Sequence, residues 1–169
     1  SPAMFIRLAL MAGLAGLSVS TIAADKPTAD ALVAKNLEAR GGADKLRAIK
    51  SLNATGKMRF GGGMEAQVSA YAIAPDKSRF EFSLQGLTAV NAWDGRQAWA
   101  INPFQGRREP QKVSDDDAKG LVRAADIGGA LLDWKAKGST LEYLGTEDID
   151  GTDAHKLRVT FKNGDSQVL

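Results

Sequence analysis

Cysteine is absent from this 169-residue chain, and histidine occurs once, at position 155. Without cysteine there is no disulfide, no thiolate metal ligand, no cysteine nucleophile and no lipidated N-terminal cysteine. No second histidine accompanies His155 to form a transition-metal site or a catalytic triad. On the strand of residues 155–161 this histidine is expected at the rim of the core. The sequence therefore offers no residue set for thiol chemistry, for a transition-metal site or for a histidine-based triad, and no cofactor is expected.

An excess of charge of either sign is also lacking. The chain has 22 Lys and Arg residues against 20 Asp and Glu residues, a formal charge of +2. Nucleic-acid binding domains carry a broad basic field, so no nucleic-acid partner is expected. Hydrophobic residues make up 44% of the chain and charged residues 25%, a composition typical of globular proteins. The length suits one domain.

The short motifs that suggest chemistry have simpler explanations. Asp115, Asp116 and Asp117 follow Ser114, as acidic residues do in the first turn of a helix. The glycines of residues 61–63 lack the Lys and Ser or Thr of a phosphate-binding loop and predict a hairpin. The pair Arg107-Arg108 is either a solvated loop or a contact for lipid headgroups or an acidic partner.

The N-terminus has the organisation of a secretory signal peptide. Ser1-Pro2-Ala3 resembles a remnant of cloning, Met4 is the expected start, and Arg7 supplies the positive charge. The apolar stretch of residues 8–19 is shorter than the ~20 residues of a spanning helix, which favours a signal peptide over an uncleaved anchor. Small residues at positions 20–24 suit cleavage. We therefore expect residues 1–24 to be removed, and residues 25–169 to form one periplasmic domain.

Helices are predicted in two regions. Thr28 is predicted as the N-cap of a first helix that ends at Gly41-Gly42, and a short turn is predicted at residues 44–49. The second region begins at Ser114, breaks at Gly128-Gly129 and includes a further short helix over residues 130–137.

Between and after these regions the apolar period is two, which is typical of strands. The hairpin signals Asp94-Gly95, Asp150-Gly151 and Asn163-Gly164 join several of them. Short turns imply an antiparallel meander. The last strand begins at Ser166 and ends at Leu169, so we expect one or more closing strands to be missing. The strands are predicted at residues 52–60, 64–72, 79–84, 88–93, 97–101, 140–148, 155–161 and from 166.

The predicted architecture is α+β: a curved antiparallel sheet whose apolar face is covered by the two helical regions. Helices that only partly fill a concave sheet leave an apolar cavity, the usual character of a ligand site. Small inward residues such as Ala54, Ala66 and Ala70 either allow close helix packing or leave room for a ligand. Large side chains either line a cavity or simply pack. The candidate ligand-binding residues are Met58, Phe60, Phe80, Phe82, Trp93, Trp99, Leu121 and Trp134.

A resemblance to a known family rests on residues 74–108. The pattern is a strand, Asp94-Gly95, a strand with Trp99, then Asn102-Pro103-Phe104. It resembles LolA and its relatives, the periplasmic carriers of outer-membrane lipoproteins. The segments of residues 39–46 (A-R-G-G-x-x-K-L) and 151–157 (G-T-D-A-x-K-L) look like those of outer-membrane lipoprotein-sorting proteins.

The resemblance implies an unclosed β-barrel with acyl chains held under helices, membrane-bound donor and acceptor partners, and no enzyme activity. LolA carriers typically have Arg before the Pro that precedes the third strand, and here Ala74 precedes Pro75. A carrier of lipoproteins or lipids is the function expected. The alternative is a sensor or scaffold domain of the same fold that binds a lipid or protein without delivering it.

If the closing strands are absent, the exposed strand edge after residue 161 is available to pair with a second copy of the chain, because unpaired strand edges associate readily. Size-exclusion chromatography with light scattering should then show a dimer. A monomer at all concentrations would contradict this expectation.

Overall fold

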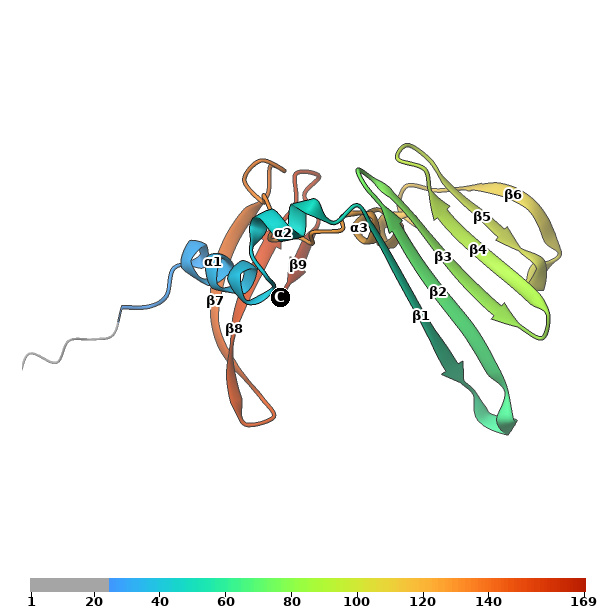
Figure 1. Ribbon diagram of the computed structural model, residues 1–169, viewed down its shortest axis with the longest axis horizontal. Helices are drawn as coiled ribbons and strands as arrows, with labels where there is room; N and C mark the ends of the chain where they lie inside the picture. The colour runs from blue at the N-terminus through green and yellow to red at the C-terminus, as the bar shows by residue number, and fades with distance from the viewer. Residues whose placement is uncertain (1–24) are drawn as a thin grey trace, which may run out of the picture.

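A computed structural model of the chain describes residues 25–169 (Figure 1). The predicted signal peptide, residues 1–24, lies outside the described part. The described residues form two antiparallel sheets, one of six strands and one of three, so the predicted antiparallel α+β architecture is confirmed. The helices are α1 (Ala29–Ala39), α2 (Ala43–Ala48) and α3 (Lys119–Ala125).

The larger sheet is a meander with strand order β1-β2-β3-β4-β5-β6. Its outer strands, β1 and β6, each pair with a single neighbour, so the sheet is open. The sequence predicted five of these strands and missed β6, which contains Arg107 and Arg108 where a loop was expected. The strands are β1 (Ser51–Arg59), β2 (Glu65–Ile73), β3 (Lys77–Leu84), β4 (Leu87–Trp93), β5 (Ala98–Asn102) and β6 (Arg107–Val113).

Two short 3₁₀ helices connect strands of this sheet. The first, η1 (Gly61–Gly63), joins β1 to β2, where a turn was predicted. The second, η2 (Pro103–Gln105), joins β5 to β6. Pro103 stands at its start, where a missing N–H costs nothing, and Gly106 ends it in the left-handed conformation with a φ of 72°.

The smaller sheet carries the main apolar core. It consists of β7 (Thr140–Ile149), β8 (Thr152–Thr160) and β9 (Ser166–Val168). Leu157 and Val159 of β8 pack with Leu131 and with Val33 of α1. The predicted turn at Asp150-Gly151 is confirmed, with φ values of 51° and 82°, as a type I′ hairpin requires.

The two helical regions do not cover the same sheet. Helix α1 packs against the three-stranded sheet, whereas α3 packs against β2, β3 and β4 of the larger one. In Figure 1, α1 and the three-stranded sheet lie on one side of α3 and the six-stranded sheet lies on the other. The expectation that both regions cover one concave face is therefore wrong, because α1 already buries its apolar side elsewhere.

The capping residues Thr28 and Ser114 were predicted correctly, but the short helix predicted over residues 130–137 does not form. The N-cap role of Thr28 is confirmed, since its hydroxyl accepts a hydrogen bond from the N–H of Ala31 at 3.1 Å. Ser114 accepts one from Asp117 at 3.2 Å, although regular helix begins only at Lys119. Residues 130–137 form consecutive turns, because Asp133 has a φ of 54°, a left-handed conformation that a right-handed helix does not accommodate.

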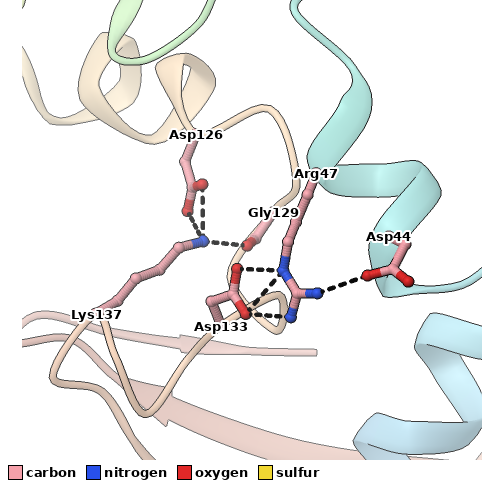
Figure 2. A network of polar contacts seen from close by, with 6 residues as sticks. All are labelled: Asp44, Arg47, Asp126, Gly129, Asp133 and Lys137. Atoms are coloured by element: carbon pink, nitrogen blue, oxygen red, sulfur yellow. Dashed lines mark hydrogen bonds and ion pairs between the residues drawn. The ribbon is translucent and has the colours of Figure 1, made fainter.

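A network of ion pairs fixes these turns to α2 (Figure 2). The guanidinium of Arg47 donates to both carboxylate oxygens of Asp133, at 2.6 and 2.9 Å, and to Asp44 at 3.1 Å. Lys137 donates to Asp126 at 2.8 Å and to the carbonyl of Gly129 at 3.0 Å. The two parallel hydrogen bonds between Arg47 and Asp133 fix the relative orientation of the side chains and also contribute to stability.

The pair between Arg47 and Asp133 gives a testable pH dependence. The hydrogen bond from Arg47 holds the pKa of Asp133 below its usual 3.8. A carboxyl whose pKa is lowered on folding stabilises the protein above the unfolded value, and this contribution is lost as pH falls through the folded value. We expect Asp133→Asn to lower the free energy of unfolding in urea at about pH 7 and to have a smaller effect near the folded pKa.

Asparagine tolerates the left-handed conformation of Asp133 as well as aspartate does, so this variant isolates the charge. The matched control is Asp44→Asn, whose fully exposed carboxylate contacts the same guanidinium. Equal losses in the two variants, or a loss independent of pH, would contradict the assignment.

Candidate ligand-binding face

The pairing of β1 to β5 places apolar side chains on one side of the larger sheet. Residues paired across neighbouring antiparallel strands project from the same face. Three rows of paired residues follow one another along the strands. The rows are Leu52-Ala72-Ser78-Trp93-Ala98, Ala54-Ala70-Phe80-Asn91-Ala100 and Gly56-Val68-Phe82-Ala89. None of these positions is charged, and we call this surface the apolar face.

Helix α3 covers only the part of the first row that lies on β2, β3 and β4. Ala72, Ser78 and Ala98 are buried, and the hydroxyl of Ser78 donates a 2.6 Å hydrogen bond to the carbonyl of Leu121. Ala118 and Ala125, at the two ends of the helical segment, are also buried. One end of the apolar face is therefore packed against protein.

The rows beyond α3 are open. Phe80, in the middle of the sheet, is 38% exposed, and Met58 on β1 is 45% exposed. The whole of β1 is exposed, although alternating apolar and polar residues are typical of a strand with one buried face. Soluble proteins rarely expose large contiguous apolar surface unless it binds something.

Aromatic side chains cross the open part of this face. The ring of Phe82 makes edge contacts with Phe60, at 6.4 Å between centroids, and with Phe104, at 5.8 Å. Edge-to-face pairs at such separations are favourable. Phe104 was quoted from the sequence only as part of a motif. Its signal was the continued alternation Ala98, Ala100, Asn102, Phe104 past the end of β5.

Six of the eight predicted ligand-binding residues lie at the apolar face or on the helix over it. Three of them, Phe80, Phe82 and Trp93, belong to the rows of the face. Met58 pairs with Ala66 on the same side, one pair beyond the third row, and Phe60 reaches the face through its contact with Phe82. Leu121 belongs to α3 and contacts Ser78 through its backbone.

The other two predicted residues lie elsewhere. Trp134 packs against the core of the three-stranded sheet. Trp99 pairs with Ala92 and Lys112, and these residues project from the opposite, mostly polar face. Lys112 lies 6.0 Å from the ring of Trp99, and the indole N–H donates to Asp94 at 3.2 Å. The assignment of both tryptophans to one apolar cavity is therefore wrong.

The turn between β4 and β5 is held by the same carboxylate. Asp94 accepts hydrogen bonds from the backbone N–H groups of Gln97 and Arg96, both at 2.8 Å. These bonds, with that from Trp99, lower the pKa of Asp94. The carboxylate is thus a structural acceptor that fixes the turn next to Trp93.

A cleft of about 910 Å³ lies beside the covered end of the apolar face. Trp93, α3 and the turn between β8 and β9 line it. Lys119 of α3 crosses it to Asp165 at 3.4 Å and also contacts Asp116 at 3.1 Å. Hydrogen bonds to both carboxylates raise the pKa of Lys119, and the bond to Asp116 has the larger effect. This cleft is mixed in charge, in contrast to the apolar face.

His155 is exposed and bonds to the hydroxyl of Tyr143 at 2.9 Å through Nδ1. Among residues 25–169 there is no cluster of three or more His, Asp or Glu side chains suited to a metal ion. Within the same range no helix is long and apolar enough to cross a membrane. The exposure of large apolar side chains such as Phe80 and Met58 makes the open apolar face the strongest candidate for function in the described part of the chain.

Comparison with protein-family models and with curated proteins finds no match to this chain. The assignment of function accordingly depends on the site itself.

The hydrogen bond from Ser78 to Leu121 is expected to hold α3 on the sheet. Removing it with Ser78→Ala should cost about 1 kcal/mol and speed hydrogen exchange of the amides of residues 119–125 about fivefold. Ser83→Ala is the control, because Ser83 bonds to Thr88 on the opposite face. Unchanged exchange of α3 in Ser78→Ala would show that this bond does not hold the helix.

Proposed function

We propose that this protein is a carrier of acyl chains, from lipids or lipoproteins, that acts in the periplasm and belongs to the LolA-like class. The observation that carries the proposal is the uncharged face of the six-stranded sheet, of which α3 covers only part of one row. The predicted signal peptide supports the compartment, and the motif ending in Phe104 supports the class.

The physical basis is the exposed apolar area. An acyl chain laid over Phe80 and Phe82 would leave water and contribute about 0.8 kcal/mol for each buried methylene. The same contact would bury side chains that are 38–45% exposed in the free protein, such as Phe80 and Met58. No charged group on the paired rows has to lose its hydration. Binding of this kind needs no chemical step and no cofactor.

Helix α3 is suited to control access. It has seven residues and lies on the first row of the face through small side chains and the Ser78 bond. A short helix held by few contacts opens at low free energy. We expect acyl chains to enter beneath it from the open rows, and protection of residues 119–125 from hydrogen exchange to differ between free and loaded protein.

A charge on the apolar face should abolish binding. Ala70 is exposed in the second row, between Ala54 and Phe80. We expect Ala70→Glu to weaken binding of a fluorescent fatty acid at least about tenfold, because a carboxylate would be buried against hydrocarbon. Thr55→Glu is the matched control. It adds the same charge to an exposed position on the opposite face of the neighbouring strand.

Equal affinity in the two variants, or no uptake of acyl ligands by the unmodified protein, would overturn the proposal. Delivery is tested separately by transfer of bound lipid to acceptor vesicles. Binding without transfer would favour a sensor or scaffold of the same fold. Mass spectrometry of organic extracts of the protein, gently purified from the periplasm, would identify the cargo.

A further inference from the structure

Three connections meet at the end of the larger sheet that is remote from α3. They are the segment of residues 60–64 with η1, the turn at residues 85–86 and the segment of residues 103–106 with η2. In Figure 1 this end of the sheet points away from the helices and from the three-stranded sheet. We call these three connections, with the strand residues next to them, the distal tip.

The distal tip is one continuous surface. Phe82 contacts Phe60 of the first connection and Phe104 of the third. The side-chain amide of Gln85, in the second, lies 3.7 Å from the sulfur of Met64 in the first. The backbone N–H of Phe60 also donates to the carbonyl of Met64 at 2.8 Å. These contacts hold the loops in a fixed relation.

Large apolar side chains of the tip are exposed. Phe60 is 39% exposed, and Met64 and Phe104 are each 43% exposed. They lie in loops rich in glycine, which offer little other side-chain volume to cover them. Aromatic side chains favour the boundary between lipid headgroups and acyl chains, and exposed apolar groups at such a boundary strengthen attachment to a membrane surface.

Basic side chains flank these apolar groups. Arg107 and Arg108 open β6 directly after η2, and neither forms an ion pair with any residue from 25 to 169. On the other side, Lys57 and Arg59 share a single acid, Glu65, at 3.4 and 3.2 Å. The charge around the tip is therefore net positive and is incompletely neutralised.

We propose that the distal tip docks on an anionic lipid membrane, with Phe60, Met64 and Phe104 at the interface and Arg107 and Arg108 against the headgroups. Apolar groups surrounded by cations complement a surface of negative headgroups over hydrocarbon, and each cation near such a surface contributes to the attraction. Docking in this orientation places the open rows, which lie at the tip end of the strands, close to the bilayer. The inference deepens the proposed carrier function, but it depends on different residues.

The test is sedimentation of the protein with two vesicle types, one of phosphatidylcholine and one in which about a third is phosphatidylglycerol. We expect the unmodified protein to prefer the anionic vesicles. The double variant Arg107→Glu/Arg108→Glu should bind them at least about tenfold more weakly. Lys26→Glu/Lys35→Glu, at exposed positions in and before α1, makes the same change in net charge and should bind as the unmodified protein does.

The apolar contribution is tested with Phe104→Ser. Its control is Ile73→Ser, because Ile73 is 54% exposed but lies at the opposite end of β2. We expect the first variant to lose binding about tenfold or more through the lost apolar contact, and the second to keep it.

The location of docking is tested with a fluorescent probe. Since the chain has no cysteine, Gln105→Cys accepts a single environment-sensitive label at the tip. Its emission should shift to the blue on anionic vesicles, whereas a label on Glu147→Cys, in β7, should not shift.

Two results would overturn docking: equal binding to both vesicle types, or equal loss in the test and control variants. Failure of the carrier proposal is distinguishable, because Ala70→Glu should lose acyl binding and keep vesicle binding. Vesicle binding that persists when acyl uptake is absent leaves the membrane-docking inference in place without the carrier function.

Discussion

Antiparallel pairing couples the side-chain direction of each strand to that of its neighbours. In the larger sheet, this register determines which residues share a face. Because residues paired across strands project from one face, a shift of one residue in any strand would mix the two faces. Here β1 to β5 pair in phase, so Ala54, Ala70 and Phe80 share a face while Thr55, Ser69 and Glu81 share the other. The position of α3, the open rows and the exposed phenylalanines all depend on this phase.

The features predicted from sequence are those set by local chemistry. These features depend on a few neighbouring residues, and the structure confirms them. They are the cap at Thr28, the turn at Asp150-Gly151 and the strands with period two. Strand β6 was missed because Pro110 and the charged residues next to it leave no alternation of apolar and polar residues. Proline is tolerated in it because β6 is an edge strand with one neighbour.

The features that the sequence did not predict are set by contacts between residues far apart in the chain. The left-handed Asp133, paired with Arg47 from a segment more than eighty residues earlier, prevents a helix over residues 130–137. Trp99 follows the turn held by Asp94, and its pairing with Ala92 places it on the polar face. Trp134 packs with α1 and β8. Trp93 lies on the apolar face, so the three tryptophans occupy three different environments.

The small residues of the apolar face have a consequence for recognition. Its paired rows contain Ala54, Gly56, Ala70, Ala89 and Ala100 around only a few large side chains. Such short side chains offer few projections that would hold a bound group at one position along the strands. A flexible hydrocarbon laid on it would have many positions of nearly equal energy, so it could slide rather than lock. Discrimination between chains of different length or branching would then be weak.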